Sequence, residues 1–459
     1  MAPQQATSKT TSLAFNIHRR EPELICPAKP TPCELKILSG IDHQDFIRCH
    51  LRMIFFFRHN PLTKGNGNNN HSDPVEVIRK ALAETLVYYH PFAGRLREGP
   101  DGSLSVDCNG RGALFVEADA EMALDEFGDL CPPFPCLEEL LFHDEGPRGF
   151  LHSPLLLLQV TRLKCGSFIL AFSFNHAICD GAGLGIFLRT LGELANGANV
   201  PSIPPVWDRH LLGAWVPPHA HEDVHVASDT TPHHESVVQR SFFFGSTEIS
   251  AIRRLVPSDL HGRITTFELL VSFLWRCRTL ALRLPPDAES RLMIAVNARP
   301  LFRNRPLPLG YYGNAVVFPV AIATARELSE QPLVYAIRLL QDAKSSVTEE
   351  YVWSVAGGLG TRGRKHQTMS ETFFVSDARH LGLDQVDLGW GQPVYGGAAG
   401  DGLGGFDGAS WLVRWKNKNG ETGIIVPVLL PEPATERFAE QLALVFNNDG
   451  CSKPLRPSL

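Results

Sequence analysis

The feature that most constrains the fold of this chain is a proline- and histidine-rich stretch in its middle, residues 201–236. Prolines recur along it, histidines gather toward its end, and no apolar period is sustained. Because proline fixes φ and lacks an amide N–H, such a stretch suits neither a helix interior nor a central strand. It predicts a long surface crossover between two halves, residues 1–200 and 237–459. A chain of 459 residues also fits two hydrophobic cores of roughly 200 residues each.

Each half mixes helix-like and strand-like segments. Apolar residues recur at helical spacing, beside capping or turn residues, over 75–87, 182–194, 267–282, 331–340 and 434–445. Short apolar runs predict strands at 155–160, 168–174, 241–244, 291–297 and 423–429, and a hairpin joins 94–96 to 104–106 through Pro100-Asp101-Gly102. Strands and helices do not alternate strictly. We therefore expect an α/β fold with mixed sheets and a site at the junction of the halves.

Charge and composition exclude several classes of function. A net charge of −6 and a pI near 6.3 argue against a nucleic-acid-binding protein, which needs a concentrated basic face. No run approaches the ~20 apolar residues of a membrane span. The cysteines form no CxxC pair and no signal peptide is recognisable, so we expect reduced thiols in the cytoplasm. The C-terminal Pro457-Ser458-Leu459 shares only its last residue with a peroxisomal signal, which makes that compartment the alternative.

The most informative segment for chemistry is Phe174-Asn-His-Ala-Ile-Cys-Asp-Gly181. An apolar strand ends there, and Asp180-Gly181 turns the chain into a helix. A histidine at such a turn is held by rigid elements and can face a cavity, as a general base requires. Its ordinary pKa near 6.5 lets it accept a proton at neutral pH. His176 and Asp180 are therefore candidate catalytic residues, with Asp180 either orienting His176 or tying the loop to an arginine.

Spacing alone leaves other interpretations open, and it favours a core histidine beside an N-cap aspartate. A metal site is not expected, because His176 and Asp180 have no third ligand nearby and histidine-rich loops are usually solvated. Gly181, Gly183 and Gly185 follow a strand and open a helix, as in a dinucleotide-dependent oxidoreductase, but isoleucine replaces the third glycine of that motif. A second match, at 400–405, has no following helix. A binding protein without catalysis is a further alternative, which an intact His176 disfavours.

A glycine-rich segment, Val386-Asp-Leu-Gly-Trp-Gly-Gln-Pro393, forms the second cluster. Two glycines around a tryptophan, with a proline following, predict a rigid loop rather than a helix or strand. Trp390 either belongs to a ligand site or anchors the loop to a domain. The residues alone do not separate these two roles.

Taken in order, these segments resemble the signatures of the BAHD acyltransferases, plant acyl-CoA-dependent enzymes whose motifs read HxxxDG and DFGWG. His176–Gly181 is similar to the first motif, and Asp387–Gly391 to the second with Leu388 in place of phenylalanine. The shorter blocks 89–95, 265–268, 275–278, 297–300 and 310–314 also fit the family pattern, so the similarity spans nearly the whole chain. The segments 27–35, 57–61 and 394–397 resemble the alcohol acyltransferases of the family, which include benzyl alcohol O-benzoyltransferases.

The resemblance implies two domains similar to chloramphenicol acetyltransferase, joined by the crossover, with an active-site channel at their interface. It implies a monomer that takes acyl-CoA as co-substrate and a small alcohol as acceptor, with no permanently bound cofactor. His176 would remove the alcohol proton as the oxygen attacks the thioester in a ternary complex. By the family's pattern Asp180 and Gly181 belong to the structural motif, and Asp180 pairs with Arg299. The loop with Asp387, Gly389, Trp390 and Gly391 would likewise support architecture and CoA binding.

Two departures from the family pattern bear on catalysis and substrates. Hydroxycinnamoyl-transferring relatives place a tryptophan shortly before the second motif, where its N–H can serve the oxyanion. This chain has Ser376-Asp377-Ala378 there, so the Ser376 hydroxyl or backbone N–H groups are the candidate donors. The apolar segment 53–57 stands where shikimate-using relatives carry hydroxyls, so Met53 and Phe55 are candidate acceptor-pocket residues unless they are ordinary core. We expect benzoyl-CoA and benzyl alcohol as substrates, with acetyl-CoA or hydroxycinnamoyl-CoA and an aliphatic alcohol as alternatives.

Overall fold

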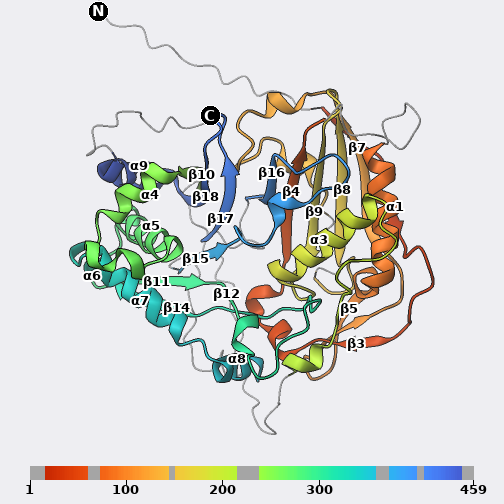
Figure 1. The fold of residues 1–459 in the computed structure, drawn as a ribbon, viewed down its shortest axis with the longest axis horizontal. Helices are drawn as coiled ribbons and strands as arrows, with labels where there is room; N and C mark the ends of the chain where they lie inside the picture. The colour runs from red at the N-terminus through yellow and green to blue at the C-terminus, as the bar shows by residue number, and fades with distance from the viewer. Residues whose placement is uncertain are drawn as a thin grey trace, which may run out of the picture.

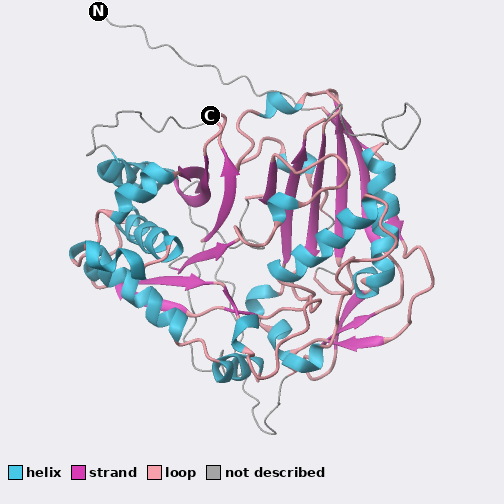
Figure 2. Cartoon of the chain, viewed as in Figure 1, coloured by secondary structure: helices cyan, strands magenta, loops and turns pink. Residues whose placement is uncertain are grey.

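The structure is a computed structural model that describes residues 16–59, 73–143, 150–213, 237–357, 372–400 and 408–446. Two large sheets, each accompanied by helices, make up the two sides of the molecule (Figures 1 and 2). Several predicted features lie outside the described residues. They are the crossover from 214 to 236 with its histidines, the glycines at 402–405 and the C-terminal tripeptide.

The first sheet has seven strands in the order β1-β7-β8-β9-β4-β16, with β2 also paired to β7. Their bounds are β1 (Ile17–Arg19), β2 (Glu23–Ile25), β4 (His50–Phe57), β7 (Ala113–Ala120), β8 (Leu156–Leu163), β9 (Phe168–Asn175) and β16 (Tyr395–Ala398). Helices α1 (Pro74–Tyr88) and α3 (Gly181–Ala195) pack on one face of this sheet (Figure 1). Every residue of β9 is buried, which fits its apolar sequence from Phe168 to Phe172.

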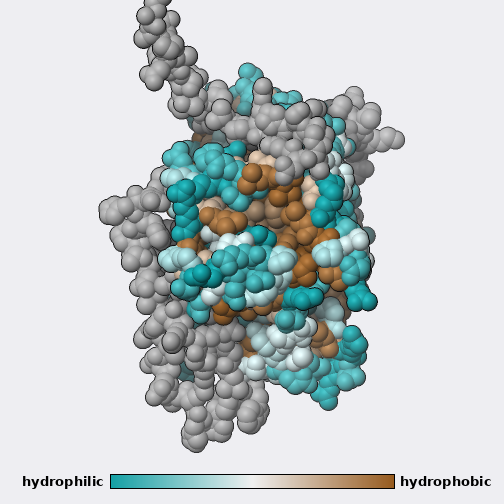
Figure 3. Space-filling model, turned by 90° about the vertical axis from the view of Figure 1, so that its left-hand side faces the viewer, coloured by the Kyte–Doolittle hydropathy of each residue, from teal (hydrophilic) through white to brown (hydrophobic). Residues whose placement is uncertain are grey.

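The second sheet has six strands in the order β10-β18-β17-β15-β11-β14. Their bounds are β10 (Val237–Phe244), β11 (Glu289–Ile294), β14 (Val320–Thr324), β15 (Thr372–Asp377), β17 (Ala409–Lys416) and β18 (Thr422–Pro431). Its helices are α4 (Ser246–Arg253), α5 (Thr266–Leu282), α6 (Ala325–Glu330), α7 (Leu333–Ser345) and α9 (Glu432–Phe446). The almost wholly buried α5 is the centre of this second core. Seen from the side of these helices, polar residues surround an apolar area (Figure 3).

Smaller elements complete the described chain. They are a three-stranded sheet of β3 (Leu35–Ile37), β6 (Leu104–Asp107) and β5 (Arg95–Glu98), the pair β12 (Val296–Asn297) and β13 (Val316–Val317), and helices α2 (Leu137–Leu140) and α8 (Glu349–Ala356). The predicted hairpin is confirmed as β5 and β6, which pair antiparallel. Among the described residues no helix combines the length and apolar character that a membrane span requires.

The predicted helices are confirmed, with small shifts at their ends. The side chain of Asp73 caps α1 by accepting from the amide of Val75, as the sequence pattern indicated. The helix predicted from 331 begins at Leu333, because Gln331 precedes a proline and is extended, and Pro332 is the N-cap. The strand predicted over 291–297 is two strands, since the amide of Ala295 donates to Val375 and the chain then pairs with β13.

The two halves of the sequence interpenetrate. The strand β16 belongs to the second half of the chain, yet it pairs antiparallel with β4 in the first sheet. The described part of the predicted crossover, residues 201–213, is anchored to the rest of the chain, because Val206 forms a β-bridge with Tyr311 and Arg209 is buried. The boundaries of the two domains stay predictions.

Candidate active site

His176 lies where β9 ends and the chain turns toward α3. Its amide donates to the carbonyl of Cys49 (2.9 Å), and its carbonyl accepts from Nδ2 of Asn314 (2.8 Å). The side-chain oxygen of Asn175 accepts from the amide of Ala177 and stabilises the turn. Elements of both halves therefore hold the backbone of His176, and the residue is only 7% exposed.

The imidazole of His176 is suited to accept a proton. Burial lowers the pKa of His176 below its usual 6.5, and the charge of Asp180 offsets only part of this effect. The ring is therefore neutral at neutral pH. Its Nδ1 is buried and has no hydrogen bond of normal geometry with a described residue, although the backbone of His176 and Cys179 and the side chain of Asn314 lie near enough to raise the pKa of the ring in part. A neutral imidazole has one nitrogen that accepts a hydrogen bond, so a ring on a cavity wall can take the proton of a substrate hydroxyl.

The carboxylate of Asp180 is engaged away from His176. It accepts two hydrogen bonds from Arg299 (2.7 and 3.0 Å), one from the amide of Gly183 (2.9 Å) and one from the amide of Ala315 (2.9 Å). Burial alone would raise the pKa of Asp180, but the Arg299 charge and these hydrogen bonds hold it below its usual value. The expected ion pair is thus present. It caps α3 and ties the start of this helix to the second half of the chain.

A second buried ion pair, which the sequence did not indicate, supports the same turn. Arg209 donates to both oxygens of Asp42 (2.8 and 2.9 Å) and to the carbonyl of Ile178. Asn314 bridges this pair to the site, because its Nδ2 donates both to Asp42 (2.7 Å) and to the carbonyl of His176. The only available signal was the family block 310–314, which contains Asn314. Nothing in the sequence around Asp42 or Arg209 pointed to the pairing.

His176 and Asp180 line a cavity of about 70 Å³ between the two sheets. Apolar side chains from both halves form most of its wall, namely Leu51, Met53, Phe174, Leu184, Val316, Phe318, Phe374, Leu381, Leu383 and Trp411. A cavity that admits benzene has about 150 Å³. An aromatic substrate therefore requires side chains of this wall to move, and the unbranched Met53 can do so readily.

The structure brings five of the eleven predicted site residues to this cavity. Ser376, Met53 and Gly181 all line it together with His176. Phe55 does not: its ring is fully buried and stacks on Phe172 at 5.8 Å. The candidate acceptor pocket therefore keeps Met53, whereas Phe55 belongs to the core.

The loop with Asp387, Gly389, Trp390 and Gly391 lies far from the cavity. Oδ1 of Asp387 accepts from the amides of both glycines (2.8 and 2.9 Å), and each glycine has a positive φ that the turn requires. The ring of Trp390 packs edge-on against Phe168 at 5.0 Å. Phe168 begins β9 and His176 follows its end, so a rise of ~3.3 Å per residue separates them by roughly 25 Å. Trp390 is an anchor for the loop and does not line the cavity.

The glycines at the start of α3 allow close packing of other chain segments. A Cβ on Gly183 would lie 2.0 Å from the carbonyl oxygen of Tyr312, and one on Gly185 would lie 2.5 Å from that of Leu381. Protein backbone occupies the space that a bound pyrophosphate would need. The dinucleotide interpretation of these glycines is therefore wrong.

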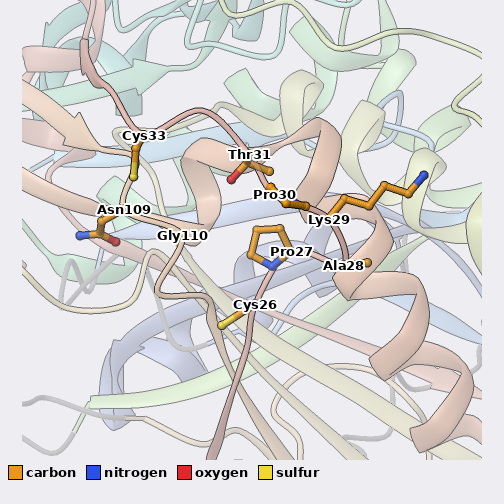
Figure 4. A pocket seen from close by; sticks show the side chains of 9 residues that line it. All are labelled: Cys26, Pro27, Ala28, Lys29, Pro30, Thr31, Cys33, Asn109 and Gly110. Carbon is orange, nitrogen blue, oxygen red and sulfur yellow. The ribbon is translucent and has the colours of Figure 1, made fainter.

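A larger hollow of about 310 Å³ lies on the surface around residues 26–33, beside Asn109 and Gly110 (Figure 4). Its described lining includes Cys26, Lys29 and Cys33 but no histidine or carboxylate, so it offers no acid–base pair. In the described part of the chain, no group of three His, Cys, Asp or Glu side chains could hold a metal ion.

Comparison with known proteins places these features in a family. Residues 15–444 match the Transferase family. The chain is 52% identical to (Z)-3-hexen-1-ol acetyltransferase of Arabidopsis thaliana (96% of this chain, 97% of that protein) and 50% identical to benzyl alcohol O-benzoyltransferase of Petunia hybrida (96% of each). Its fold is similar to that of vinorine synthase (TM-score 0.71, 22% identity, 94% and 98% covered). It is also similar to F. sporotrichioides TRI101 complexed with coenzyme A and T-2 (TM-score 0.66, 17% identity, 89% and 97% covered).

The mixed α/β fold and the buried histidine between its sheets define an acyltransferase. The chain belongs to the Transferase family, the BAHD acyltransferases. It is an acyl-CoA-dependent alcohol acyltransferase, with acyl-CoA as its co-substrate. The predicted fold class and enzyme class are confirmed.

Proposed function

We propose that this enzyme transfers the benzoyl group of benzoyl-CoA to benzyl alcohol, with His176 as general base. The observation that carries the proposal is a buried, neutral histidine on the wall of a mainly apolar cavity. The only other ionisable side chain on the described wall is Asp180, and Arg299 neutralises it. Such a wall suits an acceptor whose only polar group is the reacting hydroxyl.

The reaction follows from this arrangement. His176 takes the hydroxyl proton as the alcohol oxygen attacks the thioester carbonyl carbon, and the carbonyl electron pair moves onto oxygen. Collapse of the tetrahedral intermediate re-forms the C=O bond and breaks the C–S bond, so the electron pair leaves with sulfur. The protonated His176 returns the proton to the CoA thiolate. Both substrates are bound at once, which replaces a bimolecular encounter by a positioned one.

Other site residues have supporting roles in this proposal. Asp180 and Arg299 are positioning residues, because they hold the turn that carries His176 and make no hydrogen bond to its ring among the described residues. Ser376 lines the cavity and is a candidate donor to the oxyanion. Met53 is a candidate wall of the acceptor pocket.

A second candidate pair of substrates is acetyl-CoA and an aliphatic alcohol. It is favoured by the 52% identity to a (Z)-3-hexen-1-ol acetyltransferase, which slightly exceeds the identity to the benzoyltransferase. Both pairs place an apolar alcohol against the same wall, so they differ in the acyl group more than in the mechanism.

Release of the CoA thiol tests the proposal directly. Benzoyl-CoA and acetyl-CoA should each be assayed with benzyl alcohol, (Z)-3-hexen-1-ol and a carboxylate-bearing acceptor such as shikimate. We expect the highest kcat/KM for benzoyl-CoA with benzyl alcohol and almost none with shikimate. His176→Ala should lose activity by at least ~10²-fold while keeping its thermal stability. An active His176→Ala variant would contradict the role of the base, whereas a preference for acetyl-CoA would overturn only the substrate assignment.

We further propose that the enzyme acts as a monomer in the cytoplasm. Side chains of a single chain supply the described walls of the cavity from both sheets, so the site is complete without a second copy. Sedimentation at the enzyme concentration of the assay tests this directly, since activity that requires a dimer would contradict it.

A further inference from the structure

Trp411 carries an unpaired polar group in the wall of the active-site cavity. It lies in β17 and lines the cavity together with His176. Its indole Nε1 is buried, and no described residue accepts a hydrogen bond from it. Buried donors in folded proteins nearly always have a partner, because an unpaired one loses its hydration without compensation. The partner of this donor is therefore to be sought among the molecules that enter the cavity.

The sheet places Trp411 beside the predicted oxyanion donor. Strands β15 and β17 are parallel neighbours, and Ser376 stands opposite Trp411 in their register. Register partners on neighbouring strands project to the same face of a sheet, and both of these side chains line the cavity. The ring of Phe374, two residues before Ser376, packs edge-on against Trp411 at 6.1 Å and limits its movement.

The chemistry of an indole restricts what Trp411 can recognise. An indole N–H donates one hydrogen bond and accepts none. The alcohol proton must go to His176, so an acceptor is needed there rather than a donor. The thioester carbonyl oxygen is the group that needs a donor, because it gains negative charge when the alcohol attacks.

We propose that Trp411 is a catalytic residue that donates its indole N–H to the carbonyl oxygen of the acyl-CoA, beside Ser376. The inference rests on the proposed function, in which His176 removes the alcohol proton. When the carbonyl π pair moves onto oxygen, the Trp411 N–H stabilises that oxygen. When the C–S bond breaks, the carbonyl re-forms and the hydrogen bond weakens. No atom is exchanged with Trp411.

The same strand provides a matched control. The indole N–H of Trp415, four residues further along β17, donates to the carbonyl of Leu130 (2.8 Å). Trp415→Phe removes a satisfied hydrogen bond and should lower the melting temperature without changing kcat. Trp411→Phe makes the same reduction in ring size but removes an unsatisfied donor, so its melting temperature should fall less than that of Trp415→Phe.

Steady-state kinetics and binding of two analogues test the inference. We expect Trp411→Phe to lower kcat by about a hundredfold, with KM for acyl-CoA nearly unchanged. It should also bind a ketone analogue, in which a methylene replaces the thioester sulfur, more weakly than the wild type does. A thioether analogue, in which a methylene replaces the carbonyl, should bind both proteins equally well.

The possible outcomes separate this inference from the proposed function. An unchanged kcat in Trp411→Phe overturns the inference, and so does an equal loss of affinity for both analogues, which would mean that the ring acts only by shape. If His176→Ala is inactive in either case, the role of the base survives. If His176→Ala retains full activity, the proposed function fails, whatever Trp411→Phe does.

Discussion

Replacing Asp180 by asparagine separates a positioning role of this residue from a direct catalytic one. The carboxylate accepts hydrogen bonds from Arg299, Gly183 and Ala315. Asparagine keeps the shape and one acceptor oxygen, but it loses the charge and presents an NH₂ group to at least one of these donors. Arg299, whose side chain is 18% exposed, is then a largely buried cation without its counterion.

The size of the effect follows from the burial of the pair. Removing one partner of a buried ion pair costs about 3–5 kcal/mol. Arg299 keeps a hydrogen bond to the carbonyl of Gly313 (2.7 Å), which favours the lower end, about 3 kcal/mol. An unfolding entropy of about 2.1 cal/mol/K per residue gives roughly 1 kcal/mol/K over the 459 residues. The melting temperature should therefore fall by about 3 °C if the chain unfolds as one unit, and by about twice that if one half unfolds alone.

Scanning calorimetry and steady-state kinetics of the same preparations provide the assay. We expect Asp180→Asn to lose stability by this amount and to lose less activity than His176→Ala. Adding Arg299→Met should restore part of the stability, because the buried charge is then removed. The reasoning is refuted if Asp180→Asn melts like the wild type yet is as inactive as His176→Ala, since Asp180 would then act on the imidazole itself.

Three further changes test other parts of the structure. Because burial lowers the pKa of His176, kcat/KM should fall on the acid side with a midpoint below 6.5, and a midpoint above 7 in a pH–rate profile would contradict a buried neutral base. Gly192→Ala would place a Cβ 2.6 Å from the carbonyl oxygen of Asp387 and should destabilise the protein by about 1–3 kcal/mol in thermal unfolding. Gly262→Ala, which meets nothing within 4 Å, is the control. Met53→Ala should enlarge the cavity and raise kcat/KM for bulkier alcohols relative to benzyl alcohol, and an unchanged ranking in a competition assay would place Met53 outside the acceptor pocket.

The sequence predicted correctly those helices and strands whose formation depends on residues close together in the chain. The helices α1 and α5 have side-chain N-caps and a sustained helical period, and both form where expected. The strand β16 could not be predicted, because four residues with two adjacent glycines carry no strand signal. Its place beside β4 depends on pairing across more than three hundred residues of chain.

The site residues also divide into those that neighbouring sequence indicates and those that only the folded structure brings together. His176 and Asp180 stand out from a strand, a turn and a helix start that are adjacent in sequence. The ion pair of Asp42 with Arg209 spans 167 residues, and neither partner sits in a motif. The unpaired indole of Trp411 becomes visible only when β17 lies beside β15, since an N–H has or lacks a partner only in three dimensions. Family resemblance supplied Arg299, which spacing alone could not have paired with Asp180.

Helix α3 explains how two motifs far apart in the sequence serve one reaction. At its start, the N-cap residue Asp180 joins the helix to the turn that carries His176. Toward its other end, the Nδ2 of Asn196 donates to the carbonyl of Asp387 (2.9 Å), and Gly192 lets that carbonyl approach the helix. About 12 Å of helix separate Gly192 from Leu184, which lines the cavity, at a rise of 1.5 Å per residue. The Asp387 loop therefore connects to the reacting atoms only indirectly, through α3 and through the segment before it, whose Leu381 and Leu383 line the cavity. Changes in the loop should consequently reduce activity by displacing these elements and by lowering stability.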